Sequence, residues 1–518
     1  MSESPAYASY HGFSDSALPL DVFIDVITHC DSGMLCPLMS TCHALRDECA
    51  RRLIGEGVEL RHERDVISFV QFMSSNSNLY FAFLRELRIT ASLDGSSPPD
   101  SDASGWKKAL LRLLAHPMLS LEVLHLNAPE PLLKSEQIRA AIERLSTIKE
   151  LSLEEPRKHT WQMMQHLASP LVTVNINVVS KERYTRTSAL AVNPVTLLAR
   201  FSETLETVYW NQEDQYQNPL NISIPVNSVI QRYPRMRDFR MYYYNNCPGA
   251  AYMAFPAAVP DVRPFLVAFP NLHVFQLSHF PSTHKGFDTD NPPSLQRRDL
   301  NRLAHAALEG GRGPWPELMQ CSGDLRSLFY LAHDGPVHTL QVRSCPATAW
   351  YIDKLRTIVE DTRPTVLEVQ VLEWDVTTAP PEYSIVEALR TLPVRTVQSL
   401  QMELVLPRTL VGEPQAINRE QITDALVVAF KNLAPEIKNI QLYLDFQILI
   451  LLGGTLQDQA SWDTLDIARR LVDSIPTLEE AQVGLMFVPN MPTVGWFDPI
   501  PLMPFDDSLL QMDINGGP

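Results

Sequence analysis

The sequence predicts an α/β fold, in which helices and parallel strands alternate along a solenoid behind a small helical module at the N-terminus. The first observation is length, because 518 residues with 45% hydrophobic content exceed one compact globule unless the architecture is modular. The second is a short apolar pattern that recurs along the chain, as in FPNLHVFQL (269–277) and IPTLEEAQV (475–483). The third is that residues 18–54 do not follow this pattern.

The N-terminal module is expected to span residues 17–56, after a disordered segment at 1–16. Leu18-Pro19 opens a first helix with Asp21 in its first turn, which suits the helix dipole. Asp31-Ser32-Gly33 ends it, and two more short helices follow. The three apolar stripes are Val22, Phe23, Val26, Ile27 and Cys30, then Met34, Leu35, Leu38 and Met39, then Cys42, Leu45, Cys49 and Leu53. So short a module has a very small core, and we expect exposed apolar surface that binds a partner.

Four of the seven cysteines, Cys30, Cys36, Cys42 and Cys49, lie in this module. They are six, six and seven residues apart, whereas zinc ligands usually occur as closely spaced C-x-x-C-like pairs. We therefore interpret them as small hydrophobic residues in a reduced compartment. The sequence predicts no metal site and no cofactor.

The recurring pattern is Φ-x-x-Φ-x-Φ, where Φ is an apolar residue. Twelve segments follow it, some loosely: 83–89, 119–126, 147–153, 170–176, 204–210, 233–241, 269–277, 336–342, 363–371, 393–402, 434–442 and 475–483. In nine of them a proline lies within the four residues before the first Φ, where about three are expected from the 40 prolines of the chain. Proline cannot continue a helix and favours extended geometry in the preceding residue. Each segment is therefore predicted to be a short strand that follows a helix.

Six intervening segments have apolar residues at helical spacing: 106–115, 194–201, 349–359, 384–392, 420–433 and 464–475. A helix between successive strands favours parallel pairing with right-handed crossovers. The repeat therefore predicts an irregular solenoid over residues 57–488, with parallel strands on the concave face and helices outside.

Three segments depart from this repeat. Residues 91–105 and 281–316 are expected to be mobile insertions. The second lies in the longest gap between repeats, where Phe275 and Leu340 are sixty-five positions apart. In this gap DLRSLFY (324–330) is too close to the next unit to be a full repeat. The tail at 489–518 either caps the last repeat or carries a peptide motif for a partner.

Six glutamines take the same position in six successive units, between apolar residues: Gln276, Gln341, Gln370, Gln401, Gln441 and Gln482. Side chains alternate between the faces of a strand, so these glutamines are expected on the concave side. There they either form a ladder of amides bonded along the parallel strands or make a neutral polar floor on which a partner docks.

Charge and missing motifs narrow the function. A formal net charge of −17 opposes broad binding to nucleic acid or to anionic membranes. The N-terminus has no signal-peptide pattern and the longest aliphatic run, Ile448–Leu452, is too short to span a bilayer, so an intracellular protein is expected, cytoplasmic or nuclear. The chain has no P-loop, Rossmann, H-E-x-x-H or G-x-S-x-G motif, and a non-catalytic protein is expected.

Two resemblances to known families follow from these residues. The pattern in LEVLHL (121–126), repeated over roughly 80–490, resembles that of leucine-rich-repeat proteins. The N-terminal module resembles an F-box. Ten residues follow the F-box pattern in order: Leu18, Pro19, Asp21, Val22, Ile27, Leu35, Leu38, Cys42, Leu45 and Arg46. The alternative is an unrelated helical cap that closes the first repeat.

The F-box resemblance implies the substrate receptor of a cullin-type (Skp/cullin/F-box) ubiquitin ligase. In that reading the F-box binds a Skp-type adaptor of the cullin ligase core, and the repeats hold an unidentified protein substrate. The adaptor contacts that it implies are Leu18, Pro19, Val22, Ile27, Leu35 and Leu38. The alternative function is a leucine-rich-repeat scaffold or interaction protein unconnected to ubiquitin.

Overall fold

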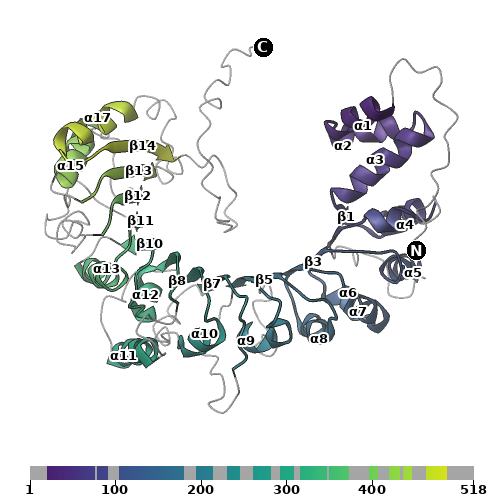
Figure 1. Cartoon of the computed structure of the whole chain (residues 1–518), viewed down its shortest axis with the longest axis horizontal. Coiled ribbons are helices and arrows are strands. Elements are labelled where there is room, and N and C mark those ends of the chain that lie inside the picture. Colours follow the sequence, from purple (N-terminus) through teal and green to yellow (C-terminus); the bar gives the residue numbers. More distant parts are fainter. Residues whose placement is uncertain are drawn as a thin grey trace, which may run out of the picture.

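The computed structural model of the chain describes residues 20–75, 79–90, 104–179, 194–213, 230–245, 261–281, 292–307, 315–346, 349–372, 396–405, 419–431, 436–445 and 463–486. In this part of the chain, fourteen strands form one sheet in sequence order. Every strand is parallel to its neighbours, so the predicted α/β fold with parallel strands is confirmed. The sheet curves into an open arc with helices on its outer side (Figure 1).

The strands are β1 (Val58–Leu60), β2 (Glu86–Thr90), β3 (Val123–Asn127), β4 (Glu150–Glu154), β5 (Thr173–Val179), β6 (Thr207–Glu213), β7 (Asp238–Asn245), β8 (Val274–Pro281), β9 (Gln320–Asp324), β10 (Thr339–Pro346), β11 (Val366–Leu372), β12 (Ser399–Val405), β13 (Asn439–Asp445) and β14 (Glu480–Met486). Each of the twelve predicted segments overlaps the first part of a strand, namely β2–β8 and β10–β14, and each of these strands extends beyond the end of its segment.

The helices before β9 are α1 (Leu20–Thr28), α2 (Ser32–Met39), α3 (His43–Gly55), α4 (Glu63–Ser74), the 3-10 helix η1 (Leu79–Phe83), α5 (Ser104–Leu114), α6 (Glu130–Leu133), α7 (Glu136–Glu143), α8 (Lys158–His166), α9 (Pro194–Leu197), the 3-10 helix η3 (Ala199–Phe201), α10 (Arg263–Ala268) and α11 (Pro292–Ala307). Those after it are α12 (Leu325–Leu331), α13 (Ala349–Thr362), α15 (Arg419–Phe430) and α17 (Thr464–Ser474). Five of the six predicted helices correspond to α5, α9 with η3, α13, α15 and α17; the sixth, 384–392, lies outside the described residues.

The core lies between the sheet and the helices, and the strand register builds it from rows. One row runs without a break from β2 to β13 in buried residues: Leu87, Leu124, Leu151, Val174, Val208, Phe239, Phe275, Cys321, Leu340, Leu367, Leu400 and Ile440. A second row starts at Ile89 and lies two residues further along each strand. Near the middle of the arc the core becomes aromatic, where Phe275 packs against Trp315 with ring centroids 4.8 Å apart. The two rows explain why Φ-x-Φ recurs, because alternate residues of every strand face the helices.

Two strands were not predicted, β1 and β9. β1 has three residues and follows directly on Gly57, whose φ of +101° suits glycine. β9 has Cys321 and Gly323 at its core positions, so it lacks the large apolar residues of the repeat. A side chain at 323 has no room, since its Cβ would lie 2.1 Å from the carbonyl oxygen of Leu277 on β8. The close approach of β8 and β9 therefore depends on glycine.

The prediction of a mobile insertion at 281–316 is wrong in the described part. Pro281 ends β8, residues 292–307 form α11, and Trp315 is buried in the core. The polar composition of residues 292–307 did not indicate a packed helix. α11 carries most of its charges outward and buries Arg298, Asn301 and His305. Of the other segments, 91–103, the N-terminal residues before Leu20 and the tail 489–518 lie outside the described residues. DLRSLFY (324–330) covers all of α12 except Leu331, in agreement with its not being a full repeat.

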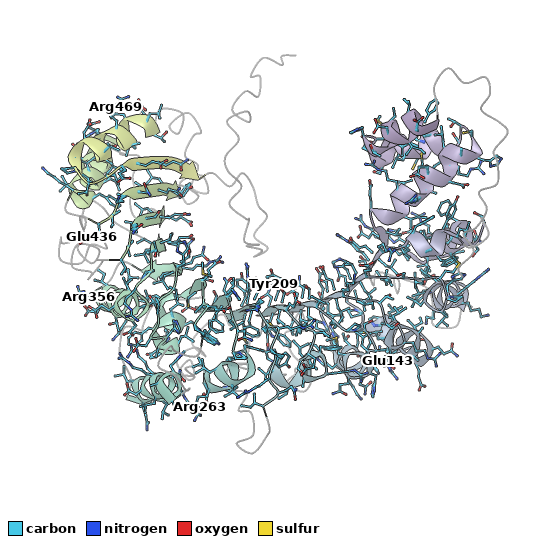
Figure 2. All side chains as sticks on the ribbon, viewed as in Figure 1. Glu143, Tyr209, Arg263, Arg356, Glu436 and Arg469 are labelled. Atoms are coloured by element: carbon cyan, nitrogen blue, oxygen red, sulfur yellow. The ribbon has the colours of Figure 1, made fainter. Side chains whose placement is uncertain are left out.

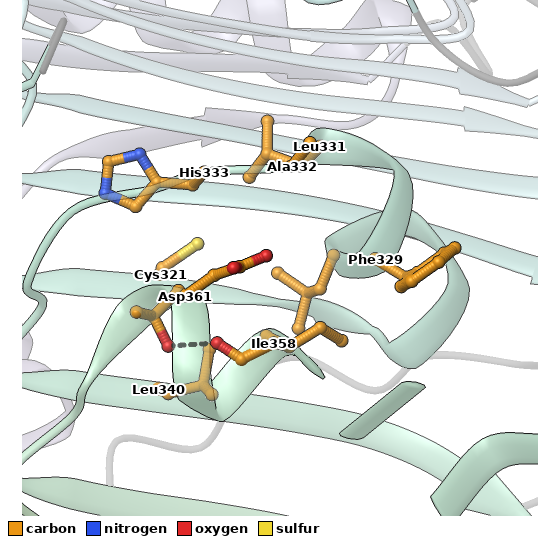
Figure 3. A pocket seen from close by; sticks show the side chains of 10 residues that line it. Cys321, Phe329, Leu331, Ala332, His333, Leu340, Ile358 and Asp361 are labelled. Atoms are coloured by element: carbon orange, nitrogen blue, oxygen red, sulfur yellow. Dashed lines mark hydrogen bonds between the residues drawn. The ribbon is translucent and has the colours of Figure 1, made fainter. Parts of the chain in front are cut away.

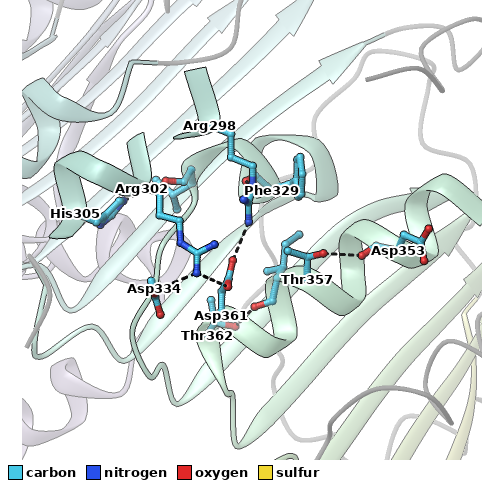
Figure 4. Close-up of polar contacts among 11 residues, drawn as sticks. Arg298, Arg302, His305, Phe329, Asp334, Asp353, Thr357, Asp361 and Thr362 are labelled. Carbon is cyan, nitrogen blue, oxygen red and sulfur yellow. Dashed lines mark hydrogen bonds and ion pairs between the residues drawn. The ribbon is translucent and has the colours of Figure 1, made fainter. Parts of the chain in front are cut away.

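The helix α11 is held by the C-terminal end of α12 (Figure 4). The last carbonyls of a helix have no partner within it. Here the Arg298 Nε atom donates to Phe329 O at 3.1 Å, Asn301 Nδ2 donates to Tyr330 O at 2.8 Å, and His305 Nε2 lies 3.1 Å from Leu331 O. Arg298 also pairs with Asp361 of α13 at 2.9 Å. These contacts join three consecutive outer helices.

Replacing Gly323 with alanine tests the close approach of β8 and β9. Because a Cβ at 323 would overlap Leu277 O, we expect Gly323→Ala to lower the free energy of unfolding by about 3 kcal/mol, at the upper end for overpacked cores. Urea titration followed by circular dichroism measures the change. Gly55→Ala is the matched control, since nothing lies within 4 Å of the added Cβ at the end of α3, and it should leave stability unchanged or raise it. Equal effects of both substitutions would contradict this account.

Candidate functional site

The three N-terminal helices form a head with its own small core. That core consists of Ile27, Cys30, Leu35, Leu45 and Cys49, and it is separate from the long core under the sheet. The helix α3 contributes to both, because Leu45 and Cys49 face the head while Ala50 and Ile54 join the core of the solenoid. One rigid helix thus connects the head to the arc, as Figure 1 shows at the end near β1.

Polar contacts reinforce this connection. The Arg52 Nη1 atom of α3 donates to Ile27 O of α1 at 2.7 Å. On the other side, the Tyr80 hydroxyl of η1 donates to Asp47 of α3 at 2.8 Å, and the Arg51 guanidinium lies 5.5 Å from the centre of the Phe83 ring. The head is therefore fixed to the first turn of the solenoid through α3 and η1.

The cysteines of the head behave partly as predicted. Cys30, Cys36, Cys42 and Cys49 are all free thiols. Cys30 and Cys49 are buried in the head core, and burial raises the pKa of the Cys49 thiol. Cys36 is exposed, so the interpretation as a packed hydrophobic residue fails there.

The predicted adaptor-binding residues divide into three groups. Ile27 and Leu35 are 2% and 0% exposed and form the centre of the head core, so the prediction that they contact a partner directly is wrong. In so small a module, the side chains at the most regular apolar positions pack in the module's own core. Val22 is exposed and Leu38 is half-buried beside the core, so both reach the surface. Leu18 and Pro19 lie outside the described residues.

The exposed apolar residues of the head include three that the prediction of adaptor contacts did not name. These are Ile24, Val26 and Met34, which are 37%, 50% and 51% exposed, beside Val22 at 38%. Val22 and Val26 are four residues apart on α1 and therefore share one side of the helix. Val26 fell within the predicted apolar stripe, yet it faces outward, because Phe23, Ile27 and Cys30 already fill the inner side of α1.

The concave face of the sheet is polar along its whole length. One register row crosses all fourteen strands as Glu59, Arg88, His125, Ser152, Asn175, Tyr209, Arg240, Gln276, Ser322, Gln341, Glu368, Gln401, Gln441 and Gln482. Figure 2 shows Tyr209 of this row on the inner side of the arc, opposite Arg263 on the outer side. We call this series the concave row.

Five of the six predicted glutamines lie in the concave row, and Gln370 does not. At its place in β11 the row has Glu368, and Gln370 lies two residues further along, paired with Glu403 of β12. The prediction misplaced Gln370 by two residues because β11 begins sooner after its preceding proline, Pro364, than the other strands begin after theirs. A shift of two residues keeps the side chain on the same face, so the concave placement still holds for Gln370.

The glutamines do not form a ladder of amides in the described part of the chain. The Gln341 Nε2 atom donates to Glu368 at 2.8 Å, and Gln370 Nε2 donates to Glu403 at 2.9 Å. Gln276 accepts from the Tyr242 hydroxyl at 2.8 Å and is 2% exposed, so its prediction as an accessible partner contact is wrong. The larger side chain of Tyr242 on the neighbouring strand β7 helps to cover it.

Several polar atoms near the middle of the concave face are buried without a hydrogen-bond partner. They are Asn177 Oδ1, Asn211 Oδ1, Gln276 Nε2, Ser278 Oγ and Ser322 Oγ, on strands β5 to β9. Their register places them in the concave row or two residues beyond it. Such atoms lower stability unless water or a ligand satisfies them.

Buried histidines form a second polar cluster, beneath the helices rather than on the concave face. His333 and His305 are 4% and 3% exposed, and their ring centroids lie 5.4 Å apart. Burial lowers the pKa of His305 to about 4 and that of His333 to about 3. His333 lines a cavity of about 10 Å³ with Cys321 and Asp361 (Figure 3), at the lower limit for holding one water molecule. This cluster is therefore packed core and has no room for a substrate.

An open hollow of about 450 Å³ lies on the outer side between α7 and α8, lined by Arg139, Glu143, Gln162, Gln165 and His166. Its walls are polar side chains, whereas ligand pockets are mostly apolar with few polar groups. Among the described residues, no three histidine, cysteine, aspartate or glutamate side chains are grouped so that they could hold a metal ion. Within the same residues, no helix combines the length and the apolar character needed to cross a bilayer.

The geometry defines a class of protein: a parallel α/β solenoid with a separate three-helix head and a polar concave face. No known protein-family model matches the chain, and no curated protein is similar to it.

The histidine pair predicts the pH dependence of stability. Both pKa values lie below the ordinary value of 6.5, so the unfolded chain binds more protons than the folded chain between about pH 6.5 and 4. Stability is therefore complete above pH 6.5 and falls as the pH drops, by roughly 2 kcal/mol per histidine at pH 5. His333→Leu should remove part of this loss, whereas His338→Gln, at an exposed site, should not. Thermal melts from pH 7 to 5 measure this loss of stability. If the melting temperature fell equally with pH in the wild type and in both variants, the loss would not come from His333.

Proposed function

We propose that the chain is the substrate-receptor subunit of a cullin-type ubiquitin ligase. The head acts as an F-box that binds a Skp-type adaptor, and the leucine-rich-repeat-like solenoid holds the protein to be modified. The observation that carries the proposal is the set of exposed apolar residues on a head with its own core: Val22 and Val26 on one side of α1, Ile24 on its other side, and Met34 on α2. We call these four residues the head surface.

The head surface supports adaptor binding rather than a cap role. A cap of the first repeat would bury its apolar residues against the solenoid, as Ala50 and Ile54 of α3 do. The head surface belongs to α1 and α2, and α3 lies between these helices and the solenoid in Figure 1. Exposed valine, isoleucine and methionine on a small rigid unit are typical of a site that a second subunit covers.

The function needs no catalytic residue in this chain. Two binding surfaces on one rigid body raise the effective concentration of a substrate lysine near an enzyme that carries ubiquitin. The head is fixed to the solenoid through α3, Tyr80 and Asp47, and the solenoid core is continuous from the head to β14. A rigid connection of this kind keeps the distance between the adaptor and the substrate constant.

The adaptor role is tested by charge on the head surface. Val22→Asp with Val26→Asp should abolish co-purification with a Skp-type adaptor, because two carboxylates would be buried in an apolar interface. Leu18→Ala with Pro19→Ala should weaken the same interaction. The matched control is Leu303→Asp, since Leu303 is 64% exposed on the outer helix α11, far from the head. Its binding should equal that of the wild type.

Circular dichroism confirms that each variant remains folded. Loss of adaptor binding by the folded head variants alone supports the proposal. Wild-type protein that fails to bind the adaptor, or head variants that bind normally, would leave a repeat scaffold unconnected to ubiquitin as the better description.

A further inference from the structure

We propose that the concave floor of β11–β14 binds an extended protein segment whose lysine or arginine side chain pairs with Glu368. This inference rests on the proposed recognition role of the solenoid and names the chemistry of the partner segment. It does not depend on the adaptor or on ubiquitin.

The charge of this floor favours a cation. The described side chains that face the concavity from β11 to β14 are Val366, Glu368, Gln370, Ser399, Gln401, Glu403, Asn439, Gln441, Tyr443, Glu480 and Gln482. Three of them are carboxylates, the rest are neutral, and no lysine or arginine occurs among these described positions. A partner segment with positive charge therefore complements the floor.

Glu368 offers a ligand cation a half-buried carboxylate. Its side chain is half-buried at the β11 position of the concave row, and burial raises its pKa. The Gln341 amide donates a hydrogen bond to its Oε2 atom at 2.8 Å, which orients the carboxylate but adds no positive charge. Arg343 on β10 lowers the pKa only in part. A partially desolvated carboxylate of this kind is stabilised by an approaching cation.

Tyr443 of β13 adds an aromatic surface to the same floor, two strands away from Glu368 in the sheet. Burial, and after it the negative charge of Glu368, raises the pKa of the Tyr443 phenol. Gly484 of β14 gives the ring its room, because a Cβ there would lie 3.0 Å from the Tyr443 ring. A cation beside a carboxylate and over an aromatic ring gains from both, and this combination suits lysine and arginine.

The amides beside Glu368 fit the main chain of an extended segment. Gln401, Gln441 and Gln482 follow Glu368 in register on consecutive strands, and they make no side-chain hydrogen bonds to one another in the structure. Each amide offers a donor and an acceptor. At about 4.8 Å between strands, the row from Glu368 to Gln482 spans about 14 Å, the length of roughly four extended residues.

The experiment measures binding of labelled, end-blocked random nonapeptides to the full chain by fluorescence anisotropy. Four peptide pools have lysine, arginine, glutamine or glutamate fixed at the centre. Wild-type protein should bind the lysine and arginine pools and not the glutamate pool. Glu368→Gln keeps the shape of the side chain and removes its charge, so it should weaken binding of the cationic pools about tenfold. The affinity should also fall as the pH is lowered and Glu368 becomes protonated.

The matched control is Glu360→Gln, which removes the same charge from an exposed position on the outer helix α13 and should change binding by less than about twofold. Equal weakening by both variants would show general attraction to an acidic protein and overturn the proposal. No binding of any pool, or preference for the glutamine or glutamate pool, would also overturn it. Binding of Glu368→Gln to the Skp-type adaptor is measured in parallel and should be unchanged. Failure of the peptide-binding proposal can therefore be distinguished from failure of the proposed adaptor role.

Discussion

The alternation of side chains along a parallel strand, kept in register over fourteen neighbours, is the constraint on which the rest of this structure depends. It places leucine, valine and phenylalanine against the helices and, one residue later, glutamine, asparagine and glutamate in the concavity. Core and concave row are therefore two consequences of one backbone pattern. Because each strand pairs only with its neighbours, an irregular unit such as β9 is accommodated locally and the register on both sides survives.

The region around β9 shows how the solenoid absorbs such an irregularity. Cys321 and Gly323 leave little apolar volume on the core side of this strand, and the buried helix α12 follows at once with Leu325, Leu328 and Phe329. α12 is short and its last carbonyls need donors, which α11 supplies through Arg298, Asn301 and His305. The polar residues of α11 thus hold the end of α12, a role that the polar composition of the segment does not indicate. Asp361 then compensates the charge of Arg298, and burial raises the pKa of this aspartate.

The head illustrates the competition between folding and recognition in a small module. Its core takes Ile27 and Leu35, the residues with the strongest apolar signal, and what remains for a partner is the outer side of α1 with Met34. The concave face shows the complementary case, in which neutral amides orient carboxylates such as Glu368 without neutralising them. Both surfaces are held by rigid elements, so a partner meets preformed geometry rather than loops.

The sequence by itself determined the class of fold, twelve of the fourteen strands, the short helices of the head and the side of the sheet on which the glutamines lie. These features are local, because periodicity and proline act within a few residues. The tertiary structure alone decided the register that replaces Gln370 with Glu368, the burial of Gln276 beside Tyr242, the inward direction of Ile27 and the helical nature of 292–307. Each of these depends on contacts between residues far apart in the chain, and an apolar or polar pattern does not specify which neighbour will cover a given side chain.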